Sequence, residues 1–194
     1  MTSSTLPVLN SLTIQLPDWV APFVSARGPA RDDGDRMRLA IELARQNVER
    51  GTGGPFGAAV FAQGEPYPLS VGLNCVVRSN NSALHAEVTA LMLAEASLQS
   101  FTLCKPEMPA YELYTSCDPC AMCLGAIFWS GVRRIVCGAD REDAGNIGFD
   151  EGPVFPESYT YMRARGVVIE TGFLRAEAKT VFDLYHQREG LIYN

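Results

Sequence analysis

Two separate stretches of this sequence carry side chains that bind zinc. SALHAEVTALMLAEA places His85 at the head of an apolar helical pattern, and CDPCAMC carries Cys120 and Cys123. Two thiols three residues apart can point at one ion from the first turn of a helix. One imidazole and two thiolates form a zinc donor set with a fourth position left for water. The sequence therefore predicts a catalytic zinc site at His85, Cys120 and Cys123.

A carboxylate accompanies the predicted ligands, because Glu87 follows His85 by two residues. Two thiolates cancel the charge of Zn²⁺, so this zinc is a weaker Lewis acid than one held by three neutral ligands. A water at such an ion needs a neighbouring base to complete its deprotonation. We therefore predict that Glu87 does not ligate the metal and instead carries protons.

The remaining thiols leave other interpretations open. A Cys-x-x-Cys pair can also be a redox pair or half of a structural zinc site. Cys117 lies three residues before Cys120, and as a fourth ligand it would close the site and make it structural. That arrangement would leave Glu87 without a role, so we expect Cys117 not to bind metal. We assign no chemical role to the remaining cysteines or to the second histidine. Packing in a strand or loop fits Cys75, Cys104 and Cys137, and an exposed position on the last helix fits His186.

Composition restricts the class of protein. The chain has 194 residues, enough for one domain with a sizeable core, and its net charge of −6 disfavours binding through phosphates. No apolar run approaches the ~20 residues of a membrane helix. No basic residue precedes Arg27, and no signal-peptide core is visible. We therefore expect a cytoplasmic protein with reduced cysteines, no nucleic-acid partner and no membrane partner.

Hydrophobic periodicity predicts five helices and five strands. The helices are expected at 36–50, 85–99, 121–131, 156–166 and 175–190. The strands are expected at 57–62, 69–77, 111–116, 133–140 and 167–171, with an acidic loop at 142–153. After the first helix and a hairpin, helices alternate with strands. This order predicts the α/β class, a three-layer α/β/α sandwich around a mixed five-stranded sheet.

The segment before the first of these helices has a different composition. Residues 1–34 are rich in Ser, Thr, Pro and Gly, and we expect an N-terminal extended arm there. Residues 35–194 are expected to form one catalytic domain.

Taken together, His85-Ala86-Glu87 and the PCAMC stretch at 119–123 resemble the cytidine deaminase-like superfamily of zinc-dependent deaminases. Further stretches resemble the bacterial guanine deaminases of that fold, namely GGPFGAAV (53–60), GLNCVV (72–77), YTSCDPCAMCLGAIFWSG (114–131) and GFDEGP (148–153). The resemblance covers roughly residues 36–194. One departure is Asp118, because the family usually has Glu before Pro-Cys.

The resemblance implies a function and further site residues. It implies hydrolysis of guanine to xanthine and ammonia, with Zn²⁺ as cofactor and a homodimer as the assembly. It implies that Asn74 binds the polar edge of the purine through hydrogen bonds from its amide donor and to its amide acceptor. Glu151 would be a second catalytic acid beside Glu87. The resemblance also implies substrate contacts from Phe56, Ala86 and Trp129.

Other functions share some of these features. A tRNA adenosine deaminase would have the same ligands and Glu87, but it should carry a basic surface. The loop at 141–153 has one arginine and four acids, which disfavours RNA. A deaminase of a triazine such as ammeline, or of another nucleobase or nucleoside, fits the same motifs. A structural zinc module is the alternative outside the enzymes, and it would not require Glu87.

Overall fold

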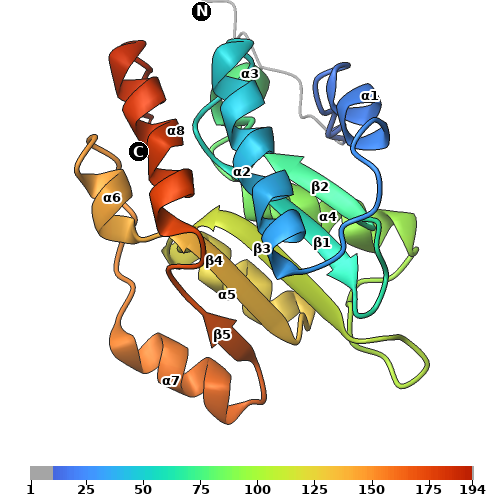
Figure 1. Cartoon of the computed structure of the whole chain (residues 1–194). Coiled ribbons are helices and arrows are strands. Elements are labelled where there is room, and N and C mark those ends of the chain that lie inside the picture. Colours follow the sequence, from blue (N-terminus) through green and yellow to red (C-terminus); the bar gives the residue numbers. More distant parts are fainter. Residues whose placement is uncertain (1–10, 194) are drawn as a thin grey trace, which may run out of the picture.

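The computed structural model describes residues 11–193, which form a five-stranded sheet between two layers of helices (Figure 1). The strands are β1 (Gly57–Ala62), β2 (Ser70–Leu73), β3 (Tyr111–Cys117), β4 (Arg134–Ala139) and β5 (Val168–Glu170). The helices are α1 (Val20–Ser25), α2 (Asp33–Glu49), α3 (Val76–Ser79), α4 (Ala86–Ser97), α5 (Ala121–Ser130), α6 (Arg141–Gly145), α7 (Pro156–Ala164) and α8 (Arg175–Gln187). None of the helices described is long and apolar enough to cross a membrane.

The sheet is mixed, as the order of elements predicts. Its strand order is β2-β1-β3-β4-β5. Strand β1 is antiparallel to β2 and β3, whereas β3, β4 and β5 are parallel to one another. The carboxyl ends of β3 and β4 therefore meet at one edge of the sheet, where Cys117 pairs with Ala139. Helix α5 and helix α6 begin just beyond this edge.

The two faces of the sheet are covered by different helices. Figure 1 shows α2 and α8 on one face and α4 and α5 on the other. Large buried side chains on the α2 and α8 side include Met37, Ile41, Phe61 and Phe182. Those on the α4 and α5 side include Leu91, Leu113, Ile127 and Ile135. The predicted three-layer α/β/α sandwich is confirmed, with a core on each face of the sheet.

Glycine on the strands lets two helices approach the sheet closely. A Cβ at Gly72 would collide with the backbone of α4 at Ala86 and Ala90. A Cβ at Gly57 would collide with the backbone of α2. Because Gly72 holds the first turn of α4 against β2, it also fixes where His85, just before that turn, is placed.

The N-terminal segment is partly helical and not wholly extended. Residues 1–10 lie outside the described part, but α1 forms at Val20–Ser25. Trp19, Val20 and Phe23 pack against the core on the α2 side. The Trp19 indole Nε1 donates to Thr52 Oγ1 at 3.2 Å. Apolar residues at helical spacing from Leu16 onward explain this helix, and the division of the chain after residue 34 stays a prediction.

Two other predictions of local structure were wrong. The strand expected at 69–77 ends at Leu73, because Asn74 turns the chain into α3 and its Oδ1 accepts from Val76 N at 3.3 Å. The loop expected at 142–153 contains α6, which begins with a capping box between Asp140 and Asp143. Both turns use short polar side chains that bind nearby backbone amides.

Candidate active site

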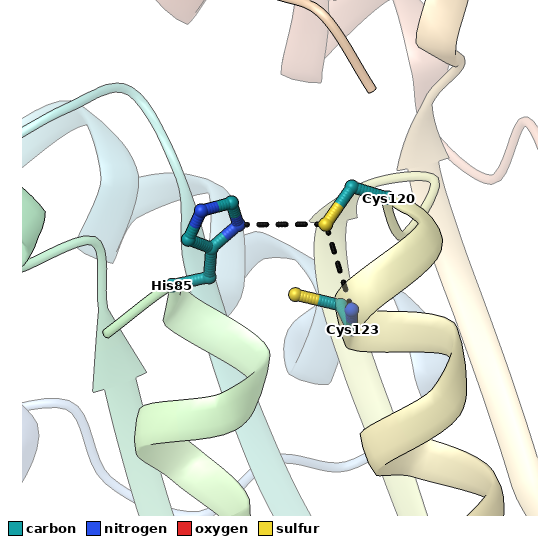
Figure 2. Close-up of side chains that lie close together, drawn as sticks. All are labelled: His85, Cys120 and Cys123. Atoms are coloured by element: carbon teal, nitrogen blue, oxygen red, sulfur yellow. Dashed lines mark hydrogen bonds between the residues drawn. The ribbon is translucent and has the colours of Figure 1, made fainter. Parts of the chain in front are cut away.

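His85, Cys120 and Cys123 meet at the starts of two neighbouring helices. His85 is the N-cap residue of α4 and Cys120 the N-cap residue of α5, with Cys123 one turn further along α5 (Figure 2). Cys120 Sγ lies 3.5 Å from His85 Nδ1 and accepts from Cys123 N at 3.5 Å. One ligand atom from each of the three residues lies within 4.8 Å of the others. The structure therefore brings the predicted triad together.

The donor set fits zinc. Ligand bonds of about 2.0–2.3 Å place the donors of a tetrahedral zinc site only a few ångströms apart, so the ligand atoms would close in slightly around an ion. Hydrogen bonds from Cys123 and His85 favour the Cys120 thiolate and lower its pKa to about 4. The N-terminus of α5 adds positive potential at the same sulfur. A thiolate ready at neutral pH is what the metal requires.

Cys117 lies outside the triad. Its thiol is buried, and its Sγ donates to the backbone oxygen of Asp140 at 3.5 Å. Burial raises the pKa of the Cys117 thiol well above its ordinary value. A neutral thiol bonded to a carbonyl matches the expectation that Cys117 does not bind metal.

Glu87 is buried beside the ligands. Its side chain is in the first turn of α4, and its Oε2 accepts from Cys123 Sγ at 3.4 Å. Burial, and then the nearby Cys120, raises the pKa of Glu87. A raised pKa makes this carboxyl a better proton acceptor than an exposed glutamate, as a general base requires.

Glu151 reaches the same place from the segment between α6 and α7. Its backbone oxygen accepts from Ala121 N, the first residue of α5, at 3.0 Å. Gly152 has φ +68, and a Cβ there would lie only 3.3 Å from Ala121 Cβ. Burial, followed by the charges of Cys120 and Glu87, raises the pKa of Glu151 to about 8. The structure thus brings together two buried carboxyls whose pKa values are raised.

A small cavity joins these groups. It has a volume of about 10 Å³ and is lined by Phe56, His85, Glu87, Asp118, Cys120, Glu151 and Tyr193. Sequence reasoning missed Tyr193 and treated Asp118 only as a turn residue. The position of Asp118 at the end of β3, next to a ligand, was a usable signal. Nothing local marks Tyr193, which packs on Gly54 and Phe149.

Asn74 lies beside one wall of this cavity, because its backbone N donates to the Phe56 oxygen at 3.1 Å. Phe56 lines it, and its ring packs edge-on against Phe149 at 5.1 Å. Asn74 is 1% exposed, and its Nδ2 is a buried donor without a hydrogen-bond partner among the described residues. A buried donor left without a partner costs free energy, so this amide is suited to a bound molecule.

Two residues with expected substrate contacts lie elsewhere. Ala86 is fully buried in the core on the α4 side, so its side chain does not line the cavity. Trp129 is 79% exposed and packs edge-on against Phe128 near the end of α5. Its expected contact with the substrate ring stays a prediction, and its side chain is not among those that line the cavity.

Comparison with known proteins identifies the family. A model of the cytidine and deoxycytidylate deaminase zinc-binding region matches residues 30–139. The chain belongs to this family. It is a zinc-dependent hydrolytic deaminase, and His85, Cys120 and Cys123 form a cluster that could hold the metal.

Its relatives include guanine deaminases. Guanine deaminase of Bacillus subtilis is 38% identical over 121 residues, which are 62% of this chain and 73% of that protein. NE0047, solved in complex with 2,6-diaminopurine, has a sequence 40% identical to this chain. The two structures match with a TM-score of 0.88 over 95% of this chain and 97% of that one. A structure of guanine deaminase from Nitrosomonas europaea has 39% sequence identity to this chain and a TM-score of 0.87, and the match covers 93% of this chain and 99% of that one. A tRNA-specific adenosine deaminase of Buchnera aphidicola is 34% identical over 55% of this chain and 66% of its own length.

Proposed function

We propose that this deaminase converts guanine and water to xanthine and ammonia. The observation that carries the proposal is one cavity lined by His85, Cys120 and two carboxyls with raised pKa. The buried Asn74 amide lies beside Phe56 of that lining. In this reaction the water oxygen bonds to the ring carbon, the exocyclic C–N bond breaks, and ammonia leaves with the protons that it gains. The relatives support a purine substrate, because NE0047 binds 2,6-diaminopurine and 8-azaguanine.

Glu87 is proposed to carry the proton of the attacking water. Bound zinc supplies Lewis acidity, which makes water a nucleophile near neutral pH. Glu87 accepts a proton from this water and delivers it to the ring nitrogen next to the attacked carbon. The burial of Glu87 suits this exchange, since its raised pKa makes it a stronger base than an exposed glutamate.

Glu151 is proposed to protonate the leaving amine. Its pKa of about 8 keeps it protonated at neutral pH, as a general acid requires. It reaches the cavity from a different element than Glu87, so the two carboxyls can serve opposite sides of the reacting carbon. One proton carrier then activates water while the other releases ammonia.

The purine is proposed to bind between Asn74 and Phe56 after the C-terminal segment moves. A cavity of about 10 Å³ is at the lower limit for one water and is far too small for a purine. Tyr193 forms one wall of it from the segment after α8. Displacement of this segment would expose the Phe56 face and the Asn74 edge, and its return would exclude water.

Substrate specificity can be tested directly. Ammonia release would be measured with guanine, guanosine, adenine, cytosine, cytidine, ammeline and an adenosine-containing tRNA anticodon stem. We expect guanine to give the highest kcat/KM. Preferential turnover of ammeline or of the RNA would replace the proposed substrate, and Glu87→Gln provides the blank for each assay. The net charge of −6 is the observation that ranks RNA below the free bases.

A homodimer in the cytoplasm completes the proposal. Exposed apolar side chains gather on or near α5 and α7, namely Met122, Trp129, Phe155 and Tyr161. Tyr161 also lines a groove of about 510 Å³ between these two helices. Exposed patches of this kind often mark association surfaces. Light scattering should give twice the chain mass, and Trp129→Asp should lower it, whereas a monomeric wild type would refute this part.

A further inference from the structure

Arg141 lies where three parts of the active-site wall meet. It is the first residue of α6, and its Nη1 lies 3.6 Å from Asp118 Oδ2 at the end of β3. The same Nη1 donates to the Tyr159 hydroxyl on α7 at 2.6 Å. Its guanidinium also lies over the Tyr159 ring, 5.2 Å from the centroid. One side chain therefore links the turn before Cys120 with α6 and α7.

This link spans the segment that carries Glu151. The chain leaves α6 at Gly145, passes through Glu151 and enters α7 at Pro156. Figure 1 shows the segment descending from α6 to α7 along one side of the molecule. Arg141 holds the element before the segment to the element after it, so the two ends of the Glu151 loop have a fixed separation.

The loop contacts the zinc helix close to Glu151. The backbone bond from Ala121 N to the Glu151 oxygen and the close approach of Gly152 to Ala121 place it against α5. Phe149, before Glu151, is 4% exposed and packs edge-on against Phe56, and Val154, after it, packs against the core on the α4 side. The Arg141 link adds a further anchor at buried side chains, because Asp118 and Tyr159 are each 7% exposed.

The Arg141 link also suits a positioning role by its chemistry. A guanidinium is planar and always charged, so it can serve a carboxylate and a phenol at once in a set geometry. Truncating it would leave the buried Asp118 carboxylate without its cation, and Asp118 lines the cavity. Both contacts of the link would then be lost, the one with the turn before Cys120 and the one with α7.

We propose that Arg141, braced between Asp118 and Tyr159, is a positioning residue that holds the Glu151 carboxyl in place to protonate the leaving amine. This inference rests on the proposed role of Glu151. Arg141 does not touch the reacting atoms: it acts by positioning the loop, and its charge also works against the raised pKa of Glu151. Tyr159 and Asp118 are the two ends of the brace.

A double-mutant cycle in the zinc-loaded protein tests the brace. We expect Arg141→Gln to keep zinc and KM while kcat falls about 10- to 100-fold, the range caused by misplacing a catalytic group by about an ångström. Arg141→Lys should recover part of kcat, because it keeps the charge but not the planar fork. In a Glu151→Gln background, Arg141→Gln should change kcat by no more than about twofold, since the group that it positions is gone.

The control is Arg163→Gln. Arg163 also lies over the Tyr159 ring, at 5.8 Å, but its hydrogen bond goes to the Ile169 backbone. It should leave kcat unchanged. If Arg141→Gln does not fold, Tyr159→Phe takes its place, because this change removes the hydroxyl that accepts from Arg141. The same double-mutant cycle with Glu151→Gln then tests the brace.

The outcomes separate the two proposals. If Glu151→Gln turns over like the wild type, the role of Glu151 is wrong and the brace has no target. If Glu151→Gln is slow but the effects of Arg141→Gln and Glu151→Gln multiply, the brace is wrong and the proposed function stands. If Arg163→Gln slows turnover as much as Arg141→Gln, the effect belongs to general packing of α7, and the brace is again overturned.

Discussion

At the scale of single residues, the active site separates metal binding from proton transfer. His85, Cys120 and Cys123 offer their donors to one point, whereas Glu87 and Glu151 line the same cavity as carboxyls with raised pKa. Burial is the largest cause of the raised pKa at both carboxyls. The same desolvation that makes their charge costly makes them useful proton carriers.

Glu87→Gln should keep the zinc and lose turnover. Glutamine has nearly the same shape but cannot accept a proton, and general acid–base catalysis contributes about 10²–10⁴-fold. We expect kcat to fall by at least this range while elemental analysis still finds one zinc per chain. A variant with nearly normal kcat would show that Glu87 is not the proton carrier.

Glu151 should set the alkaline limb of the pH profile. A general acid acts only when protonated, so kcat should fall as pH rises through the pKa of about 8. The charge of bound zinc lowers the pKa of a nearby carboxyl, so the limb is expected at or below about 8. Glu151→Gln should flatten this limb and lower kcat with zinc retained. An unchanged profile in the variant would assign the limb to another group.

At the scale of elements, the site depends on how closely α4 and α5 approach the sheet. His85 and Cys120 are both N-cap residues, so a shift of either helix moves a ligand directly. Gly72 on β2 is the position that lets α4 come close, because a Cβ there would collide with the Ala86 backbone oxygen.

Gly72→Ala should therefore weaken metal binding as well as stability. Backbone cannot move aside as a flexible side chain can, so α4 must shift and carry His85 with it. We expect a loss of about 1–3 kcal/mol in the free energy of unfolding, typical of overpacking, together with weaker zinc affinity. Chemical denaturation and metal competition measure the two effects. Gly145→Ala is the matched control, since nothing lies near its Cβ position, and equal losses in both variants would contradict this explanation.

At the scale of the whole molecule, zinc joins two helices that start from different strands. The metal binds the folded arrangement and not the unfolded chain, so its binding free energy adds to stability. Removal of zinc by a chelator should lower Tm by roughly 5–15 °C for a chain of this size. Cys120→Ser should already melt low and respond little to chelation, and Cys117→Ser should behave like the wild type. Loss of zinc without any change in Tm would exclude this contribution.

The sequence determined the metal site because its ligands lie in short local motifs. Cys120 and Cys123 fall within one helical turn, so their spacing indicated a shared direction. Glu87 shares the site because His85 is the N-cap residue before the first turn of α4, and the His-Ala-Glu motif marked this pair. Helix and strand periodicity predicted the five strands and the three layers for the same reason, since each pattern is local. Predictions of strand and loop from local pattern were wrong where short polar side chains turned the backbone, as at Asn74 and Asp140.

Only the tertiary structure decided which distant residues share the cavity. Tyr193 and Glu87 are far apart in the chain, and they meet because the segment after α8 folds over the ends of β1 and α4. Trp129 lies near the ligands in sequence, yet it faces outward because the ligands use the first turn of α5 and Trp129 lies at its end. Arg141 gained its partners only when α7 packed beside α5 and β5. Spacing fixes direction within a helical turn, whereas contacts between elements depend on how the whole core packs.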